Sequence, residues 1–113
     1  MVHAEQLTLN EFETAILRQI SRDNPTVLQS ISDLSVLSRE FTGVGSYTKF
    51  RSAETSEPRT HLSLDLLIEM PGVPIGMGAV LFLVDSKPQE LEIYTYGDPW
   101  DGKSDGFTII GAS

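Results

Sequence analysis

The chain has 113 residues, no cysteine and a formal net charge of −8, from 8 basic and 16 acidic residues. This length favours a single domain over residues 1–113, which buries roughly 65% of the surface that the unfolded chain exposes. The absence of cysteine excludes disulfides, thiolate zinc sites and thiol catalysis. The few scattered basic residues do not form the surface that nucleic acid or an anionic membrane requires. With neither a membrane-span pattern nor a signal-peptide pattern, we expect a cytoplasmic protein.

A first helix is predicted close to the N-terminus. Thr8 is the expected N-cap, with Glu11 as its capping-box partner and with Leu7 and Phe12 as a hydrophobic staple. One apolar face then follows at helical spacing, formed by Leu9, Phe12, Ile16 and Ile20. The helix should end before the Asp23-Asn24-Pro25 segment.

A second helix is predicted to follow at once. Asn24 suits the N-cap, and Pro25 suits the first helical position, where a missing amide donor has no cost. Apolar residues then recur at helical spacing, at Val27, Leu28, Ile31 and Leu34.

From residue 36 onward the pattern predicts extended structure. Alternating or continuous apolar runs indicate strands over residues 36–42, 47–51, 61–70, 77–84, 90–96 and, more briefly, 107–110. Gly43-Val44-Gly45 predicts a tight turn or bulge, and residues 52–60 predict a surface loop. The connections are too short for parallel crossovers. The expected fold class is therefore α+β, with two N-terminal helices packed on one face of a mainly antiparallel four- to five-stranded sheet.

The segment from Gly97 to Ser104 matches the phosphate-loop pattern G-x-x-x-x-G-K-[ST]. That loop needs a helix directly after its Lys-Ser pair, so that the helix N-terminus holds the phosphates. Only nine residues remain after Ser104, and they include two glycines and several β-branched residues. Asp98 and Asp101 would also repel a nucleotide. We therefore expect no nucleotide site here and predict no cofactor.

No metal site or catalytic set stands out. The aspartates at 98, 101 and 105 do not follow the spacing of an EF-hand loop, and His3 and His61 complete no three-ligand set. Strand alternation places Asp65 and Glu69 on one face and Glu92, Tyr94 and Tyr96 on one face, but whether these faces coincide depends on the strand order, which the pattern does not give. We predict no catalytic residues and no metal.

One acidic and aromatic group is a candidate partner-binding surface. Alternation places Glu92, Tyr94 and Tyr96 on the strand face opposite Leu91 and Ile93. Trp100 follows a glycine and a proline that can turn it back towards the tyrosines. Aromatic residues are enriched at interface hot spots. The alternative is that these rings pack over the core.

Two sequence strings carry a family resemblance. Residues 39–50 read REFTGVGSYTKF and residues 91–100 read LEIYTYGDPW. They resemble the REFTGVGxxTxF and LExYTYGxPW strings of a group of small, uncharacterised bacterial proteins. The resemblance spans most of residues 8–100 and implies a compact bacterial α+β domain. It carries over no catalytic residue, because the group has no assigned activity.

Three functional hypotheses follow. The leading one is a non-enzymatic cytoplasmic interaction domain that binds a basic protein, with an immunity or antitoxin role as one concrete version. The second is a small hydrolase that uses carboxylates and His61. The third is a homo-oligomeric structural protein, such as a homodimer paired through a sheet edge. Nucleic acid and membrane are not expected partners.

Overall fold

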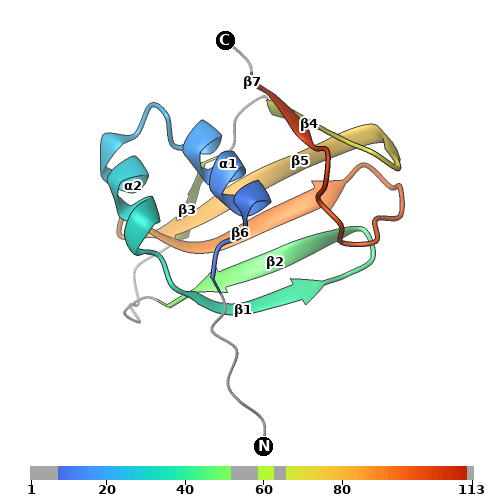
Figure 1. Cartoon of the computed structure of the whole chain (residues 1–113). Helices are drawn as coiled ribbons and strands as arrows, with labels where there is room; N and C mark the ends of the chain where they lie inside the picture. The colour runs from blue at the N-terminus through green and yellow to red at the C-terminus, as the bar shows by residue number, and fades with distance from the viewer. Residues whose placement is uncertain (1–7, 52–58, 63–65, 112–113) are drawn as a thin grey trace, which may run out of the picture.

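The computed structural model describes residues 8–51, 59–62 and 66–111. Two α-helices and a short 3₁₀ helix precede the strands: α1 is Glu11–Ile20, α2 is Pro25–Ser30 and η1 is Ile31–Asp33. The strands are β1 Val36–Phe41, β2 Gly45–Phe50, β3 Arg59–Leu62, β4 Leu66–Met70, β5 Val73–Val84, β6 Lys87–Thr95 and β7 Thr108–Gly111. The predicted α+β class is confirmed, with more strands than the four or five expected (Figure 1).

All strand pairs are antiparallel, and the strand order is β1-β2-β6-β5-β4-β7, with β3 also paired to β5. The single strand predicted over residues 61–70 is two strands, each paired with a different half of the long strand β5. His61 in β3 lies opposite Phe82, whereas Ile68 in β4 lies opposite Met77. Of the loop predicted over residues 52–60, residues 59 and 60 belong to β3, and the rest lies outside the described residues.

Both helices cover the same face of the sheet (Figure 1). Their buried apolar stripe packs on the alternate residues of the central strands, as the two periodicities require. The fully buried side chains of this layer include Phe12, Ile16, Leu17, Val27, Met77, Leu81, Leu91 and Ile93. We call the opposite face, away from both helices, the open face.

The first helix starts two residues later than predicted. Asn10, not Thr8, is the N-cap, and Glu13 completes the capping box. Asn10 Oδ1 accepts from the Glu13 amide at 2.7 Å, and Glu13 Oε1 accepts from the Asn10 amide at 3.1 Å. Thr8 was the wrong choice because Glu13 is held in place by distant residues, described below. Leu7 of the predicted staple lies outside the described residues.

The second helix begins as predicted. The Asn24 side chain accepts from the Val27 amide at 3.2 Å, and Pro25 occupies the first helical position. The α-helix is only six residues long and tightens into η1 before the chain enters β1.

Candidate functional site

The two sequence strings at residues 39–50 and 91–100 meet at one corner of the fold. The turn after β1 is tied to the end of β6 by two backbone hydrogen bonds, from the Thr95 amide to the Val44 carbonyl at 2.8 Å and from the Trp100 amide to the Gly43 carbonyl at 2.9 Å. A Cβ at Gly45 would overlap the Ile93 carbonyl oxygen, so only glycine allows this close approach. These residues of the two strings therefore have a structural role at this corner.

Trp100 belongs to this corner and not to the tyrosines. Its ring lies 6.1 Å from the ring of Phe12 in α1 and 5.7 Å from the ring of Phe41 in β1, and the residue is 8% exposed. Its indole N–H donates to the Lys103 carbonyl at 2.8 Å. The structure thus places Trp100 on the helix-covered side of the sheet, away from the open face where the sequence pattern had grouped it with Tyr94 and Tyr96.

The phosphate-loop match forms a turn without a following helix. The Thr95 hydroxyl donates to the Asp98 carbonyl at 2.6 Å, and Asp101 Oδ1 accepts from the Lys103 amide at 2.9 Å. After Ser104 the chain turns and enters β7, so the strand predicted near the C-terminus is confirmed. The helix N-terminus that phosphate binding needs is absent from residues 97–111, and the acidic side chain of Asp101 serves the turn itself.

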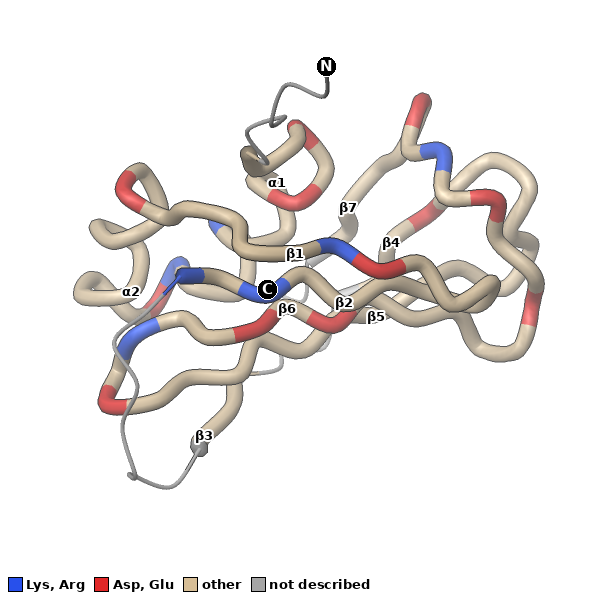
Figure 2. Tube along the Cα trace, turned by 90° about the horizontal axis from the view of Figure 1, so that it is seen from below, with Lys and Arg blue, Asp and Glu red and all other residues tan. Residues whose placement is uncertain are grey.

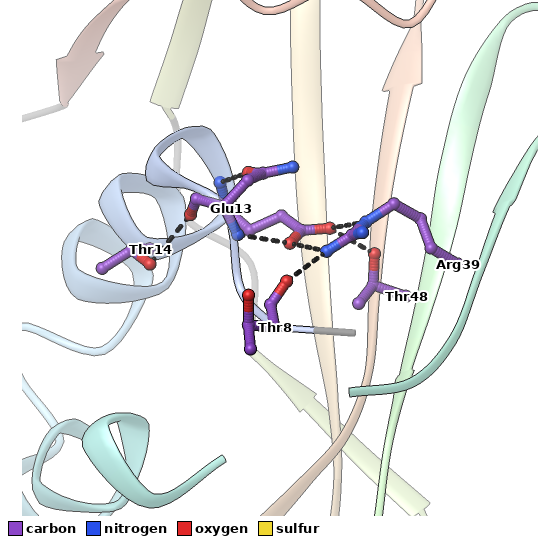
Figure 3. Close-up of polar contacts among 6 residues, drawn as sticks. Thr8, Glu13, Thr14, Arg39 and Thr48 are labelled. Atoms are coloured by element: carbon purple, nitrogen blue, oxygen red, sulfur yellow. Dashed lines mark hydrogen bonds and ion pairs between the residues drawn. The ribbon is translucent and has the colours of Figure 1, made fainter. Parts of the chain in front are cut away.

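A buried ion pair between α1 and β1 was missed by the sequence reasoning. Glu13 is 1% exposed, and its carboxylate accepts two hydrogen bonds from Arg39, at 2.8 Å from Nε and 2.6 Å from Nη2 (Figure 3). Thr48 in β2 donates a third at 2.6 Å. Arg39 Nη2 also donates to the Thr8 carbonyl at 2.8 Å. The hydrogen bonds to Glu13 raise the pKa of Arg39 above its ordinary value.

The hydrogen bonds of this ion pair indicate a structural role. Both carboxylate oxygens of Glu13 have donors, and the planar guanidinium binds them side by side, which is the strongest arrangement for such a pair. A carboxylate with every position filled is a poor acid, base or metal ligand, since it has no lone pair directed at solvent. The pair fixes α1 against β1 and β2.

The candidate site lies on the open face. Alternation in β6 is as predicted: Leu91, Ile93 and Thr95 are buried towards the helices, while Glu92 and Tyr94 are half-buried and Tyr96 is 50% exposed on the other side. Tyr47 of β2 lies directly opposite Glu92 and extends this group sideways.

Electrostatic interactions and ring contacts connect the side chains of Tyr47, Glu92, Tyr94 and Tyr96. The charge of Glu92, and a hydrogen bond that the Tyr47 hydroxyl donates to it, raise the pKa of Tyr47; Glu90 and Glu40 add to the same effect. Burial raises the pKa of Tyr94, with smaller contributions from Tyr96 and Glu92. The rings of Tyr94 and Tyr96 meet edge to face with centroids 5.6 Å apart. The open face thus carries a connected acidic and aromatic cluster.

Tyr94 also has a packing role. A Cβ at Gly78 in β5 would overlap the Tyr94 ring, so the ring lies over the bare backbone of the neighbouring strand. Tyr96, by contrast, leaves half of its surface in solvent. Of the two tyrosines, Tyr96 is the one available to a partner.

The residues of the hydrolase hypothesis are not brought together. His61 lies opposite Phe82 and Ile68 lies opposite Met77, so five residues of β5, roughly 16 Å, separate the two positions. Glu69 lies one residue further away, and Asp65 lies outside the described residues. A surface hollow of about 370 Å³ beside Glu69 is lined otherwise by apolar or small residues and a threonine.

Within the described ranges, no three His, Asp or Glu side chains gather as a metal site would require. None of the helices described is long and apolar enough to cross a membrane. Comparisons of the chain with protein-family models, with curated proteins and with solved structures found no match. Functional inference therefore depends on the geometry of the open face.

Proposed function

We propose that this chain is a non-enzymatic, cytoplasmic protein-interaction domain that binds a basic partner through its open face. The observation that carries the proposal is the position of Tyr96, half exposed on a sheet face that no described helix covers, beside Tyr94 and Glu92. Large rings supply buried area at an interface, and acidic neighbours favour and accelerate the approach of a basic protein.

The net charge of −8 supports the same choice of partner. The strand register places Glu40 of β1 and Glu92 of β6 on either side of Tyr47 in β2. Figure 2 shows acidic positions along β1 and β6. An immunity-type role, in which an acidic domain neutralises a basic toxin, is one concrete form of this function. The partner-binding set on the open face is then Tyr47, Glu92, Tyr94 and Tyr96, without Trp100, whose ring packs against Phe12 and Phe41 on the helix side.

The geometry favours this function over pairing through a sheet edge. Edge strand β1 carries a bulge at Leu37, between the paired residues Val36 and Ser38, and edge strand β7 has only four residues. Bulges and short strands are the usual means by which proteins prevent edge-to-edge pairing.

The test is capture of a partner from lysate of the source organism with the native protein and matched variants. We expect Tyr96→Ala and Glu92→Gln each to remove the captured protein without a large change in melting temperature. Leu28→Ala and Asp23→Asn make the same kinds of change at exposed positions on the helix side and should leave capture intact. Raising the salt from about 0.05 to about 0.5 M should weaken capture, because it shortens the screening length.

Capture that survives both open-face variants would refute the proposal, as would capture that either helix-side variant removes. Capture that is unchanged at high salt would refute the basic character of the partner.

A further inference from the structure

The open face has two chemically different halves, one centred on β2 and β6 and the other extending to β4 and β7. The cross-strand register places Glu40, Tyr47, Glu92 and Val80 in one row, and Ser38, Lys49, Glu90 and Phe82 in the next. We call these two rows the acidic half. Beyond Tyr94, towards β4 and β7, lies the apolar half, formed by Tyr96, Leu67 and Ile110 with Ile75 at its rim.

The apolar half contains a hollow beside Leu67 and Ile75. Leu67 lies directly opposite Ile110 and packs over Gly76, where a Cβ would overlap its side chain. Of the apolar half, Leu67 and Ile75 line the hollow of about 370 Å³, together with Gly76, Glu69 and Thr108. A hollow of this size accommodates one large apolar side chain, and such filled pockets are where interface energy concentrates.

The strand composition also indicates that this face is built to be covered. Central strand β5 has apolar residues on both sides: Leu81 and Leu83 point to the helices, while Val80 and Phe82 point to the open face and are only half-buried. An antiparallel sheet with one solvated face usually alternates apolar and polar residues, so apolar residues on both sides of a strand indicate that both faces are covered. Here the described residues supply one helical layer only.

A helix is the element that fits on such a face. An added strand needs a free sheet edge for its backbone hydrogen bonds, and the middle of a sheet face has none to offer. A helix satisfies its own backbone and exposes only side chains. From Glu90 in β6 to Tyr96 directly after it, the face runs for six residue steps, roughly 20 Å, which is the length of a helix of about 13 residues.

We propose that the open face binds an amphipathic helix of another protein, with its apolar side chains on the apolar half and its Lys or Arg side chains on the acidic half. The inference rests on the proposed function and specifies the partner's chemistry. Charge complementarity selects the occupant: Glu40, Glu90 and Glu92 outnumber Lys49 in the acidic half, and Glu69 adds a further carboxylate at the rim of the hollow.

The probe is a capped peptide of about 15 residues, made of Ala, Leu and Lys, with leucines at helical spacing in one half and lysines in the other. A second peptide has two central alanines replaced by proline, which prevents the helix. A third has glutamate in place of lysine. Each peptide is titrated into isotopically labelled protein, and backbone amide shifts report both the site and the affinity.

We expect the helical lysine peptide to shift amides of β5, β6 and β4 that border the open face, with α1 and α2 unaffected. The proline peptide should bind at least about tenfold more weakly, a loss of about 1.4 kcal/mol, and the glutamate peptide should not saturate. Glu92→Gln should weaken binding of the lysine peptide severalfold, whereas Asp23→Asn should not.

Equal binding of the proline and helical peptides to the open face would overturn the helix inference while leaving the interaction function in place. Shifts confined to the helix side, or no saturation at about 1 mM of the lysine peptide, would also overturn it. A different result would refute the interaction function itself: capture of the partner from lysate would be unchanged in both Tyr96→Ala and Glu92→Gln.

Discussion

Replacing Arg39 by leucine should destabilise the protein strongly, because it leaves the Glu13 carboxylate buried without its cationic partner. The carboxylate is 1% exposed and would keep only two of its four donors, the Asn10 amide and the Thr48 hydroxyl. Removing one partner of a buried pair costs about 3–5 kcal/mol. Since two donors remain, we expect a loss of about 3 kcal/mol, at the lower end of that range.

The assay is urea unfolding followed by tryptophan fluorescence. Trp100 is the only tryptophan and is buried beside Phe12, so its emission reports the opening of the core that the ion pair holds together. A loss of about 3 kcal/mol corresponds to a fall in melting temperature of roughly 12 °C for a chain of this length. Arg51→Leu, at the exposed residue directly after β2, is the matched control and should change stability by less than about 0.5 kcal/mol.

The double variant Glu13→Leu with Arg39→Leu separates the charge effect from lost packing. It removes both charges and leaves neither one buried alone. Its loss of unfolding free energy should therefore be smaller than the sum of the two single-variant losses by at least about 1 kcal/mol. An Arg39→Leu loss below about 1 kcal/mol, or additive losses in the double variant, would refute the reasoning.

Other predictions concern the helix start, the loop and the tyrosines. Asn10→Ala should cost about 1 kcal/mol in unfolding experiments, whereas Thr8→Ala, at an exposed position before the cap, should stay within about 0.5 kcal/mol; the reverse order would contradict the observed cap. Calorimetry should detect no binding of ATP or GTP, and micromolar affinity that Lys103→Ala removes would disprove this. In a spectrophotometric titration, Glu92→Gln should lower the pH at which Tyr47 ionises, because the carboxylate raises its pKa, and Tyr47→Phe identifies the transition. The folded-state pKa of Tyr47 lies above the unfolded value, so its contribution to stability is present below about pH 10 and is lost as the pH rises through the folded-state pKa.

The fold class, the second helix start and the faces of the strands could be predicted from sequence because each depends on neighbours along the chain. Asn24 and Pro25 cap a helix through contacts within three residues, and alternation in β6 assigns Leu91 and Ile93 to the buried side. Local periodicity carries this information whatever the strand order. The acidic and aromatic side of β6 was accordingly placed on its correct face.

Only the tertiary structure decided the start of α1, the division of β3 from β4 and the place of Trp100. The capping box formed at Asn10 because Arg39, 26 residues after Glu13, and Thr48 hold the Glu13 carboxylate. Trp100 turned to the helix side because Phe12 and Phe41 offer it buried ring contacts there. These outcomes depend on contacts between residues far apart in the chain. Such contacts close long loops and produce no repeating pattern of residue types that could be recognised in the sequence.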